Sequence, residues 1–294
     1  MNYKMILKSR TLRLKILRLL RYFPSKLMVK IQYRMKTKRR LNIKSPRFFT
    51  EKLQWYKLYY HNPLMHECVD KYRVRNYVKR KKLSHILPRL FGVYEHENEI
   101  IFSDLPKSFV LKSTIGGGGN NVLMVSDKTT WNETEFKNHI KTFPQGYIDH
   151  APGREWAYLD NYSRFIVEEN LNELTDEILL EYKFYVFSGI PQIIKVSQKN
   201  LHDNTQLKSF YDLDLNRLDY YELDGSGQLH LSKKPDNLTE MIEISKILGH
   251  DFPHVRVDLF NVNGKIFFGE LTFYDMSGYV IYNNVDFDKK LGNY

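Results

Sequence analysis

The chain has 294 residues, 42% of them hydrophobic and 14% aromatic, a composition that excludes a disordered protein and a length sufficient for one large domain or two modest ones. A single cysteine, Cys68, excludes an internal disulfide framework and favours a reducing compartment, so we expect a cytoplasmic protein. The net charge of +11 comes from one segment, because residues 1–44 hold 15 of the 45 Lys and Arg residues and no Asp or Glu.

Residues 1–44 form a basic arm in which apolar residues recur at helical spacing. The apolar positions are Leu12, Ile16, Leu19, Leu20, Phe23 and Leu27, and the basic positions between them are Lys8, Arg10, Arg13, Lys15, Arg18 and Arg21. Arg interrupts the apolar stripe too often for a membrane span, and no cleavage site follows a clean apolar core, so we expect neither a transmembrane helix nor a signal peptide.

A basic amphipathic helix without acidic residues favours an anionic membrane surface, and this is the interpretation that we prefer for the arm. The alternative is a helix that packs on the protein body and exposes a solvated basic face. No basic-aromatic alternation, zinc spacing or helix-turn-helix pattern supports nucleic-acid binding, so no nucleic-acid partner is expected.

Residues 45–105 are predicted to be a helical N-terminal region. "SPRFFTEKLQWYKLYYHNP" predicts a helix with Ser45 or Thr50 as N-cap, which stops before Pro63. "DKYRVRNYVKRKKL" predicts a second helix, capped by Asp70, with apolar residues on one face. An extended region then starts within "LPRLFGVYE".

From about residue 106 the chain consists of short apolar runs separated by turns, the pattern of mostly antiparallel strands. The predicted strands lie in "SFVLKST", "NVLMVSD", "RFIVEENL", "ILLEYKFYVFSG", "IPQIIKVSQ", "HVRVDLF" and "KIFFGELTF". Helices are predicted at "TEFKNHIKTF" and "NLTEMIEISKILGH". The fold class is therefore α+β, with a helical portion followed by a sheet-rich one.

A glycine-rich loop follows the first of these strands in "SFVLKSTIGGGGNN", where Lys112 precedes Gly116, Gly117, Gly118 and Gly119. Four consecutive glycines indicate a backbone that needs positive φ or close approach to a ligand. Exposed amides beside a lysine suit a phosphate, although no Gly-Lys-Ser/Thr of a Walker A loop follows. The alternative is a flexible hairpin tip.

The segment "HVRVDLFNVNGKIFFGELTF" predicts a hairpin with one carboxylate in each strand. A two-residue turn at Asn263-Gly264 would place Asp258 opposite Gly269 and send Glu270 to the other face. A three-residue loop, 263–265, places Asp258 opposite Glu270, and it also sorts the apolar residues onto one face. We therefore predict the three-residue loop.

That register has further consequences for the polar face. Val262 would pair with Ile266, and Arg256 would pair with Thr272. Two carboxylates across a ladder repel each other unless a cation lies between them, and hard oxygen ligands suit Mg²⁺ or Mn²⁺ bridging a phosphate. The alternative is a solvent-exposed face whose charges are offset by Arg256 and Lys265.

Two further strands carry polar residues that suit a nucleotide. Glu168, Glu169 and Asn170 end an apolar strand, where backbone groups can meet an adenine and a carboxylate can meet ribose hydroxyls; an ordinary strand end is the alternative. Lys183 lies among apolar residues of the next strand, and a buried lysine needs an anionic partner. A lysine whose amine reaches solvent is the alternative there.

Taken together, "DKYRVRNYV", "FVLKSTIGGGGNN", "IVEENL", "EYKFYVFSG" and "RVDLF...GKIFFGELTFYDMSG" occur in the order of an ATP-grasp nucleotide site. With "SPRFFTEKLQWYKLYY", the segment from about 42 to 283 resembles the TupA-like ATP-grasp family of teichuronopeptide and other cell-surface polysaccharide synthesis. The resemblance implies two α+β subdomains with the nucleotide between them: 106–170, which carries the glycine-rich loop, and 171–294, which carries the metal-binding hairpin.

The resemblance also implies roles for individual residues. Lys71, Lys112 and Lys183 would contact ATP, the Gly116–Gly119 loop would close over its phosphates, and Glu168, Glu169 and Asn170 would form the adenine and ribose hinge. Asp258 and Glu270 would hold Mg²⁺, with Arg256 beside the transferring group. Thr272 stands where ATP-grasp ligases often carry Asn, which weakens the expectation of a second metal.

The chemistry that the resemblance implies is a carboxylate attack on the γ-phosphate of ATP, followed by displacement of phosphate by an amine. The expected protein is a ligase that joins an amino acid or peptide to a sugar acid of a surface glycan, peripheral at the inner membrane face. One alternative is a glycosyltransferase, supported by the Asp-X-Asp of Asp212 and Asp214. Another is an inactive ATP-grasp binding module.

Overall fold

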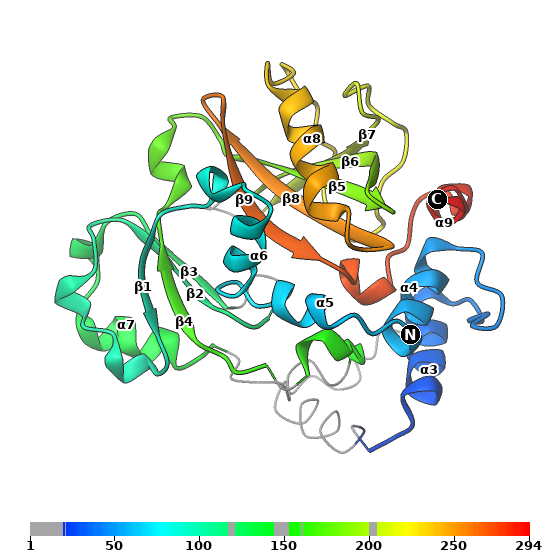
Figure 1. Cartoon of the computed structure of the whole chain (residues 1–294), viewed down its shortest axis with the longest axis horizontal. Helices are drawn as coiled ribbons and strands as arrows, with labels where there is room; N and C mark the ends of the chain where they lie inside the picture. Colours follow the sequence, from blue (N-terminus) through cyan, green and yellow to red (C-terminus); the bar gives the residue numbers. More distant parts are fainter. Residues whose placement is uncertain (1–19, 21, 117–120, 144–152, 160, 200–204) are drawn as a thin grey trace.

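The computed structural model describes residues 20, 22–116, 121–143, 153–159, 161–199 and 205–294 (Figure 1). Half of the arm's predicted apolar stripe (Leu12, Ile16 and Leu19), all six basic positions between its residues, and Gly117, Gly118 and Gly119 lie outside the described residues. The helices are α3 (Ser25–Thr37), α4 (Phe49–Tyr59), α5 (Pro63–Cys68), α6 (Val74–Arg80), α7 (Glu133–Ile140), α8 (Leu238–Gly249) and α9 (Val285–Asn293). No helix in these ranges is both long and apolar enough to cross a bilayer.

The strands form two antiparallel sheets. The first has the order β1-β4-β2-β3 and is built from β1 (Leu90–Tyr94), β2 (Phe109–Ser113), β3 (Val122–Val125) and β4 (Phe165–Glu168). The second has the order β7-β6-β5-β8-β9 and is built from β5 (Leu180–Phe187), β6 (Ile190–Lys199), β7 (Gln206–Tyr211), β8 (His254–Val262) and β9 (Lys265–Thr272). The α+β prediction and the antiparallel pairing are confirmed.

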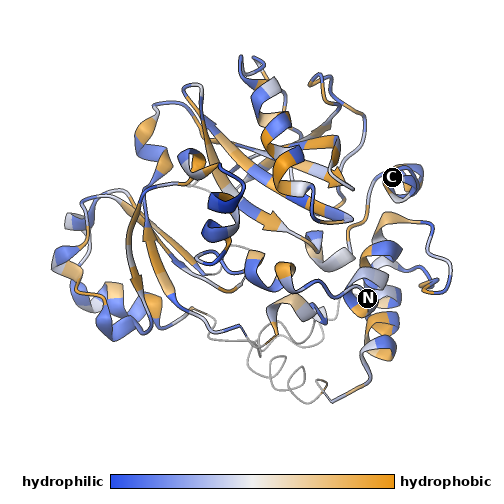
Figure 2. Cartoon of the chain, viewed as in Figure 1, coloured by the Kyte–Doolittle hydropathy of each residue, from blue (hydrophilic) through white to orange (hydrophobic). Residues whose placement is uncertain are grey.

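The two sheets lie on opposite sides of α5 and α6 in Figure 1, with α7 against the first sheet and α8 against the second. Figure 2 shows hydrophobic residues along the strands of both sheets. In β5 the alternation is plain: Phe184 packs toward Leu248 of α8, while Tyr185 belongs to a second cluster with Phe49 of α4 and Phe287 of α9. The second sheet is therefore covered on both faces, which is why its strands read as nearly continuous apolar runs.

The start and the end of α4 differ from the prediction. Neither Ser45 nor Thr50 caps α4, which begins after Phe48; the carboxylate of Glu51 accepts from the amides of Arg47 and Phe48 instead. Pro63 does more than end α4, because it is the first residue of α5.

The prediction that Asp70 caps this helix is wrong for α6 itself, whose N-cap is Arg73; the turn before α6 is capped by Asp70. Its Oδ1 accepts from the amides of Tyr72 and Arg73, and α6 proper starts at Val74. The apolar face of α6 that the sequence predicts is confirmed, since Val74, Tyr77 and Val78 are all buried.

The β8–β9 hairpin combines the two registers that the sequence offered. Its turn is Asn263-Gly264, with φ of 51° and 80°, and Val262 pairs with Lys265. The predicted three-residue loop and the Val262–Ile266 pair are therefore wrong, because Asn-Gly readily adopts the positive φ values of a two-residue turn.

Closer to the acids the register shifts by one residue, so that Asp258 pairs with Glu270 and Arg256 with Thr272, as predicted. The extra residue is Gly269, which forms a β-bulge. A Cβ there would lie 2.9 Å from the carbonyl oxygen of Asp258, so this position requires glycine. The bulge restores the facing carboxylates that the turn alone would have separated.

The described part of the arm packs on the protein body through one face of α3. Met28, Val29 and Tyr33 are buried there, and the Tyr33 hydroxyl lies 3.0 Å from Oγ1 of Thr50 in α4. For residues 25–37 the packed-helix alternative is thus realised on the inner face. The outer face keeps Leu27, Ile31 and Met35 exposed at 46%, 43% and 50%.

Candidate active site between the two sheets

A cavity of about 230 Å³ lies between the two sheets. The first sheet contributes Val110 and Lys112 of β2, Val122 and Met124 of β3, and Glu168 of β4. The second contributes Glu181 of β5, Phe260 of β8, and Phe268, Gly269 and Glu270 of β9. Lys71 and Arg75, around the start of α6, close one side. The cavity thus joins residues that are up to about two hundred positions apart in the sequence.

Five of the predicted site residues line this cavity: Lys71, Lys112, Glu168, Glu169 and Glu270. Lys71 also touches the glycine-rich loop, because its Nζ donates to the carbonyl of Gly116 at 2.6 Å. Gly116 has φ of 124°, a conformation that favours glycine, as the sequence indicated.

In the contacts described, the amine of Lys71 meets a carbonyl but no carboxylate. Burial lowers its pKa to about 8, partly offset by the charge of Glu270, while Lys112 lowers it further. A bound anion would reverse this shift, since an opposite charge favours the protonated amine. An anion in the cavity would therefore favour the charged form of Lys71.

Glu168 is buried between two cations of the same wall. Its Oε1 accepts from Arg75 at 2.7 Å and its Oε2 from Lys112 at 2.8 Å. Glu168 therefore holds Lys112 and Arg75 beside the cavity, and the ribose contact that the family resemblance implied stays a prediction. Arg75 was missed by the sequence interpretation, although it follows Lys71 by four residues.

Asn170 does not line the cavity. Its Oδ1 accepts from the amide of Asn172 at 3.3 Å and its Nδ2 donates to Ser108 at 3.1 Å, so this side chain caps the short helix Leu171–Leu174. Asn172 itself lines the cavity. Of the three hinge positions, Glu168 and Glu169 line the cavity and Asn170 does not.

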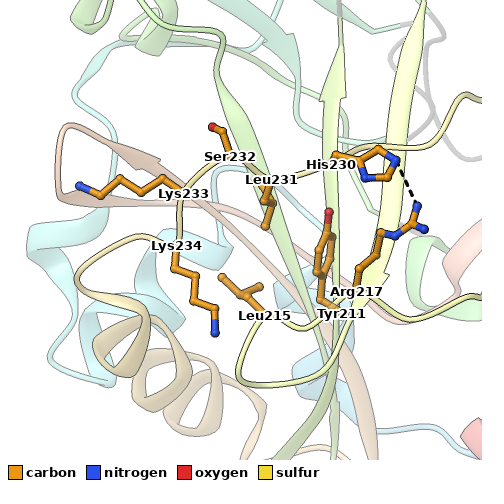
Figure 3. A pocket seen from close by; sticks show the side chains of 8 residues that line it. All are labelled: Tyr211, Leu215, Arg217, His230, Leu231, Ser232, Lys233 and Lys234. Atoms are coloured by element: carbon orange, nitrogen blue, oxygen red, sulfur yellow. Dashed lines mark hydrogen bonds between the residues drawn. The ribbon is translucent and has the colours of Figure 1, made fainter.

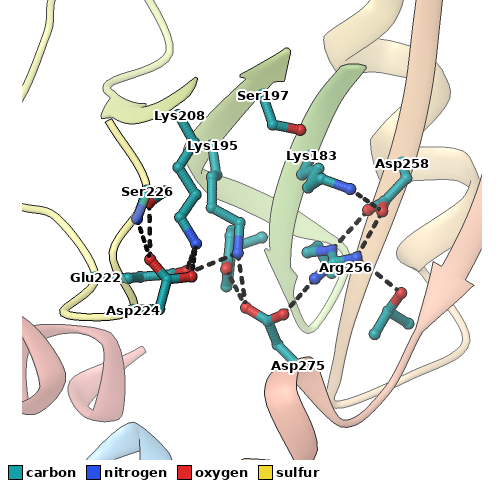
Figure 4. A network of polar contacts seen from close by, with 12 residues as sticks. Lys183, Lys195, Ser197, Lys208, Glu222, Asp224, Ser226, Arg256, Asp258 and Asp275 are labelled. Carbon is teal, nitrogen blue, oxygen red and sulfur yellow. Dashed lines mark hydrogen bonds and ion pairs between the residues drawn. The ribbon is translucent and has the colours of Figure 1, made fainter. Parts of the chain in front are cut away.

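Asp258 lies behind the cavity lining, at 0% exposure, in a buried ion network (Figure 4). Lys183 donates to it at 2.9 Å, and Arg256 donates twice, at 2.7 and 2.6 Å. Burial would raise the pKa of Asp258, but the charges of Arg256 and Lys183 outweigh it and hold that pKa below its usual range. The anionic partner that a buried Lys183 requires is thus found.

The same network continues to residues that the sequence interpretation missed. Arg256 also pairs with Asp275, which in turn holds Lys195 at 3.0 Å and the hydroxyl of Tyr185. Lys195 contacts Glu222 at 2.9 Å. Arg256 is therefore fixed from two sides, by Asp258 and by Asp275. A sequence reading could have found this network only by noticing that Lys183, Lys195 and Arg256 fall on the same face of three paired strands.

Glu270 is the more accessible member of the carboxylate pair, with 43% of its side chain exposed. Its Oε1 accepts from Thr272 at 2.6 Å and from Arg256 at 3.2 Å. No group of three or more His, Cys, Asp and Glu in the described ranges could hold a metal alone. Mg²⁺, however, is commonly held by one or two carboxylates together with substrate phosphates. Glu270 at the cavity fits that requirement, whereas both carboxylate oxygens of Asp258 already accept from Lys183 and Arg256.

A second pocket, of about 320 Å³, lies beside the other edge of the second sheet (Figure 3). It is lined by Tyr211, Leu215, Arg217, His230, Leu231, Ser232, Lys233 and Lys234, none of which belongs to the predicted site. The nearby Asp212 accepts from the amides of Asp214 and Asn216, at 3.0 and 2.8 Å. The Asp-X-Asp pattern thus forms a turn after β7, in which the carboxylate of Asp212 is taken up by local hydrogen bonds.

Two antiparallel sheets that enclose a cavity, with lysines on one wall and a carboxylate hairpin on the other, define the ATP-grasp class of fold. The family model described as TupA-like ATPgrasp matches residues 51–294, so the chain belongs to the TupA-like ATP-grasp family. No curated protein matches the chain.

Solved structures with a similar arrangement include D-alanine–D-alanine ligase from Bacillus anthracis, at 15% identity and a TM-score of 0.42, covering 70% of this chain and 57% of that chain. The same ligase complexed with ATP matches at 12% identity and 0.40, covering 70% and 54%. An ADP complex of PurK, N5-carboxyaminoimidazole ribonucleotide synthetase, matches at 15% and 0.42, covering 76% and 50%. This chain spans little more than half the length of these proteins.

Proposed function

We propose that the chain is an ATP- and Mg²⁺-dependent ligase that activates a carboxylate as an acylphosphate and joins it to an amine, with ADP and phosphate as products. The observation that carries the proposal is that Lys71, Lys112 and Glu270, from three separate elements, line one cavity. Family membership supports ATP as the nucleotide.

The phosphate-binding part would consist of Lys71, Lys112 and the backbone at Gly116. Lys112 is held by Glu168 on one side, and Lys71 is held only by a carbonyl in the contacts described. An amine that donates to neutral carbonyls and then meets a phosphate gains a charge-assisted hydrogen bond. We infer that the apolar lining, including Met124, Leu179 and Phe268, receives the adenine.

The metal would be held by Glu270, and Asp258 would join it only by releasing a hydrogen bond from Lys183 or Arg256. There it would neutralise charge on the phosphates. The contribution of the chain itself is positioning and charge. Arg256 and Lys183 lie beside the carboxylate pair and would stabilise negative charge on the transferring group. Such a reaction requires no protein nucleophile, and the buried thiol of Cys68, whose pKa is raised by burial, is not suited to be one.

The biological setting that we propose is cell-surface polysaccharide synthesis, teichuronopeptide-like or capsular, at the inner face of the cell membrane. The support is the family and the outer face of α3, where Leu27, Ile31 and Met35 are exposed beside the exposed Lys26, Lys30 and Arg34. A mixed apolar and cationic face of this kind suits an anionic lipid surface.

The test is release of ADP from Mg-ATP by the full chain, with amino acids and sugar acids supplied in pairs. We expect ADP release to require one carboxylate and one amine, and to be lost in Glu270→Gln but not in Glu240→Gln, an exposed acid of α8. Binding of Mg-ATP without ADP release from any pair would favour an inactive binding module. Stabilisation by a nucleotide-sugar but not by ATP would favour a glycosyltransferase.

A further inference from the structure

The second pocket, beside the edge strand β7, has a basic lining. Its volume is about 320 Å³, which lies within the range of about 300–1,000 Å³ that small-ligand sites span. Four of the eight described residues that line it are basic, namely Arg217, His230, Lys233 and Lys234, and none of the eight is Asp or Glu. A concave site lined by one sign of charge concentrates ligands of the opposite sign. The pocket therefore has the electrostatics of an anion site.

The floor of the pocket is apolar and held in place. Tyr211, at the end of β7, is 2% exposed, and its hydroxyl donates to the carbonyl of Leu229 at 2.8 Å. Leu215 is 6% exposed although its φ is 58°, a conformation that a bulky side chain disfavours. The turn of Asp212 maintains this conformation, because its carboxylate accepts from the amides before and after Leu215. Strained residues that their surroundings hold in place cluster at ligand sites.

Arg217 is oriented on one side of this floor. Its backbone bridges to that of Tyr211, and its Nη1 lies 2.7 Å from Oε1 of Gln228 and 3.2 Å from Nε2 of His230 (Figure 3). Its ion-pair partner, Asp219, lies 3.6 Å from Nη2 and has a side chain that is 95% exposed, so the pair is weak. The guanidinium therefore has a defined position, and its charge is only partly compensated.

The lysines supply charge from the opposite side. Figure 3 shows the side chain of Lys234 running toward Leu215, across the Tyr211 ring from Arg217. Among the described residues Lys234 has no ion pair, and the carboxylate of the neighbouring Asp212 already accepts from its own turn.

Lys233 adds charge at the rim of the pocket. It lies 3.6 Å from Asp236, but both side chains are exposed, at 79% and 90%, so this pair is also weak. The pocket thus holds three permanent positive charges that no buried acid neutralises among the described residues.

We propose that this pocket binds a small phosphate monoester, whose phosphate is bound by Arg217 and Lys234. A phosphate monoester carries a charge of about −1.5 to −2 at pH 7 and offers three acceptor oxygens, so it can accept from cations on both sides of the floor. The planar fork of an arginine binds phosphate through two parallel hydrogen bonds. A carboxylate, with a single charge and two oxygens, satisfies fewer of these donors.

The apolar floor selects an ester over free phosphate. Tyr211, Leu215 and Leu231 offer apolar surface below the cations, and Ser232 adds a hydroxyl at the wall. A sugar ring has a face of C–H groups and a rim of hydroxyls, and it therefore matches both parts of this lining. A sugar phosphate is the simplest ligand that combines such a ring with the phosphate.

The pocket is separate from the nucleotide cavity. The two share no described lining residue. The pocket lies beside β7, at one edge of the second sheet, whereas the cavity is lined by residues of β8 and β9, at the other edge. Tyr211 and Leu215 belong to the same core cluster as Leu248 of α8, so the pocket lies on the α8 side of that sheet. The inference consequently does not depend on the proposed ligase reaction.

Titration calorimetry of glucose 1-phosphate into the full chain tests the inference, with inorganic phosphate and glucuronic acid as comparison ligands. We expect saturable binding of glucose 1-phosphate and weaker binding of both comparison ligands. Saturating Mg-ATP should leave the Kd for glucose 1-phosphate unchanged, because the nucleotide occupies the other site. Added salt should weaken binding, since the contacts are ionic.

Variants of the lining locate the bound phosphate. Arg217→Gln should raise the Kd for glucose 1-phosphate at least about tenfold, through loss of charge-assisted hydrogen bonds. Arg217→Lys, which keeps the charge without the fork, should give an intermediate value, and Lys234→Met should weaken binding several-fold. Two controls should match the native chain: Lys289→Met, at an exposed lysine of α9, and Lys112→Met, in the nucleotide cavity. An unchanged Tm would show that each variant is folded.

Absence of saturable binding of glucose 1-phosphate to the native chain would overturn the inference, as would an equal Kd in folded Arg217→Gln. Equal affinity for inorganic phosphate or glucuronic acid would overturn the assignment to a phosphate ester. Displacement by Mg-ATP, or loss of binding in Lys112→Met, would place the sugar phosphate in the nucleotide cavity and overturn it as well. Failure of Mg-ATP to bind would instead contradict the proposed function and leave this inference standing.

Discussion

The two walls of the cavity hold their charges in opposite ways. Beside the first wall, the amine of Lys71 donates to a carbonyl, and burial lowers its pKa to about 8, so in the contacts described this lysine has no carboxylate partner. On the second wall, Arg256 and Asp258 are buried and already paired with each other and with their neighbours. An amine beside the first wall can therefore still pair with a bound anion, whereas the buried charges of the second wall already hold one another in fixed positions.

The largest effect should come from breaking the buried network of the second wall. Asp275→Asn leaves Arg256 and Lys195 without one shared counter-charge, and removal of one partner from a buried ion pair costs about 3–5 kcal/mol. Urea unfolding should show this loss of unfolding free energy. Glu243→Gln, which removes an exposed pair with Lys246, should cost less than about 1 kcal/mol. Similar losses of unfolding free energy in both variants would mean that the buried network contributes no more to stability than an exposed ion pair.

Lys112 on the first wall should affect ligand binding more than folding. Lys112→Met removes one charge-assisted contact with phosphate, worth about 1.5–3 kcal/mol, so the Kd for Mg-ATP should rise at least about tenfold. Titration calorimetry measures this, and Lys107→Met, at an exposed lysine outside the cavity, is the matched control. An unchanged Kd in Lys112→Met would remove Lys112 from the phosphate site.

Gly269 tests whether the bulge itself matters. In Gly269→Ala the new Cβ would lie 2.9 Å from the backbone oxygen of Asp258, and that oxygen cannot rotate away. The strand must shift, which displaces Glu270 from Asp258. We expect the dependence of ATP binding on Mg²⁺ to weaken several-fold, measured by titrating Mg²⁺ at fixed ATP. An unchanged Mg²⁺ dependence would show that the facing register is not required.

Lys71 should make ATP binding depend on pH. Its pKa in the free protein is about 8, and a bound phosphate would raise it, so the protonated form binds better. Affinity should be full below pH 8 and should fall above it, by at most about tenfold per pH unit. Calorimetry between pH 7 and 9.5 tests this, and Lys71→Arg, which stays charged, should show a flat profile. A pH dependence in Lys71→Arg equal to that of the native chain would assign the titration to another group.

The smallest effect is expected on the surface of α3. Ile31→Glu places a negative charge on the exposed apolar face, beside Lys30 and Arg34, and should weaken sedimentation with anionic vesicles several-fold. ATP binding should not change, because Ile31 lies outside the cavity. Unchanged sedimentation would indicate that this face does not contact lipid. If Ile31→Glu weakened sedimentation with neutral vesicles but not with anionic ones, electrostatic attraction between α3 and anionic lipid would be excluded.

The comparison of the walls also shows what a sequence can predict. Lys112 and Glu270 were identified because glycines and strand alternation are local signals, whereas Lys71 was named only through the family resemblance. The bulge at Gly269 was not, since one inserted residue changes the register without changing the pattern of either strand. Asp275 and Glu222 lie outside the strands, and only the packing of distant elements brings both of them to Lys195.

The central claim is that ATP binds between the two sheets, with its phosphates on Lys71 and Lys112 and its metal on Glu270. The most direct measurement is titration calorimetry of Mg-ATP into the native chain and into Lys112→Met and Glu270→Gln. The account predicts saturable binding to the native chain that is weakened in both variants, with the loss in Glu270→Gln seen only when Mg²⁺ is present. Absence of binding to the native chain, or equal binding to all three proteins, would contradict it.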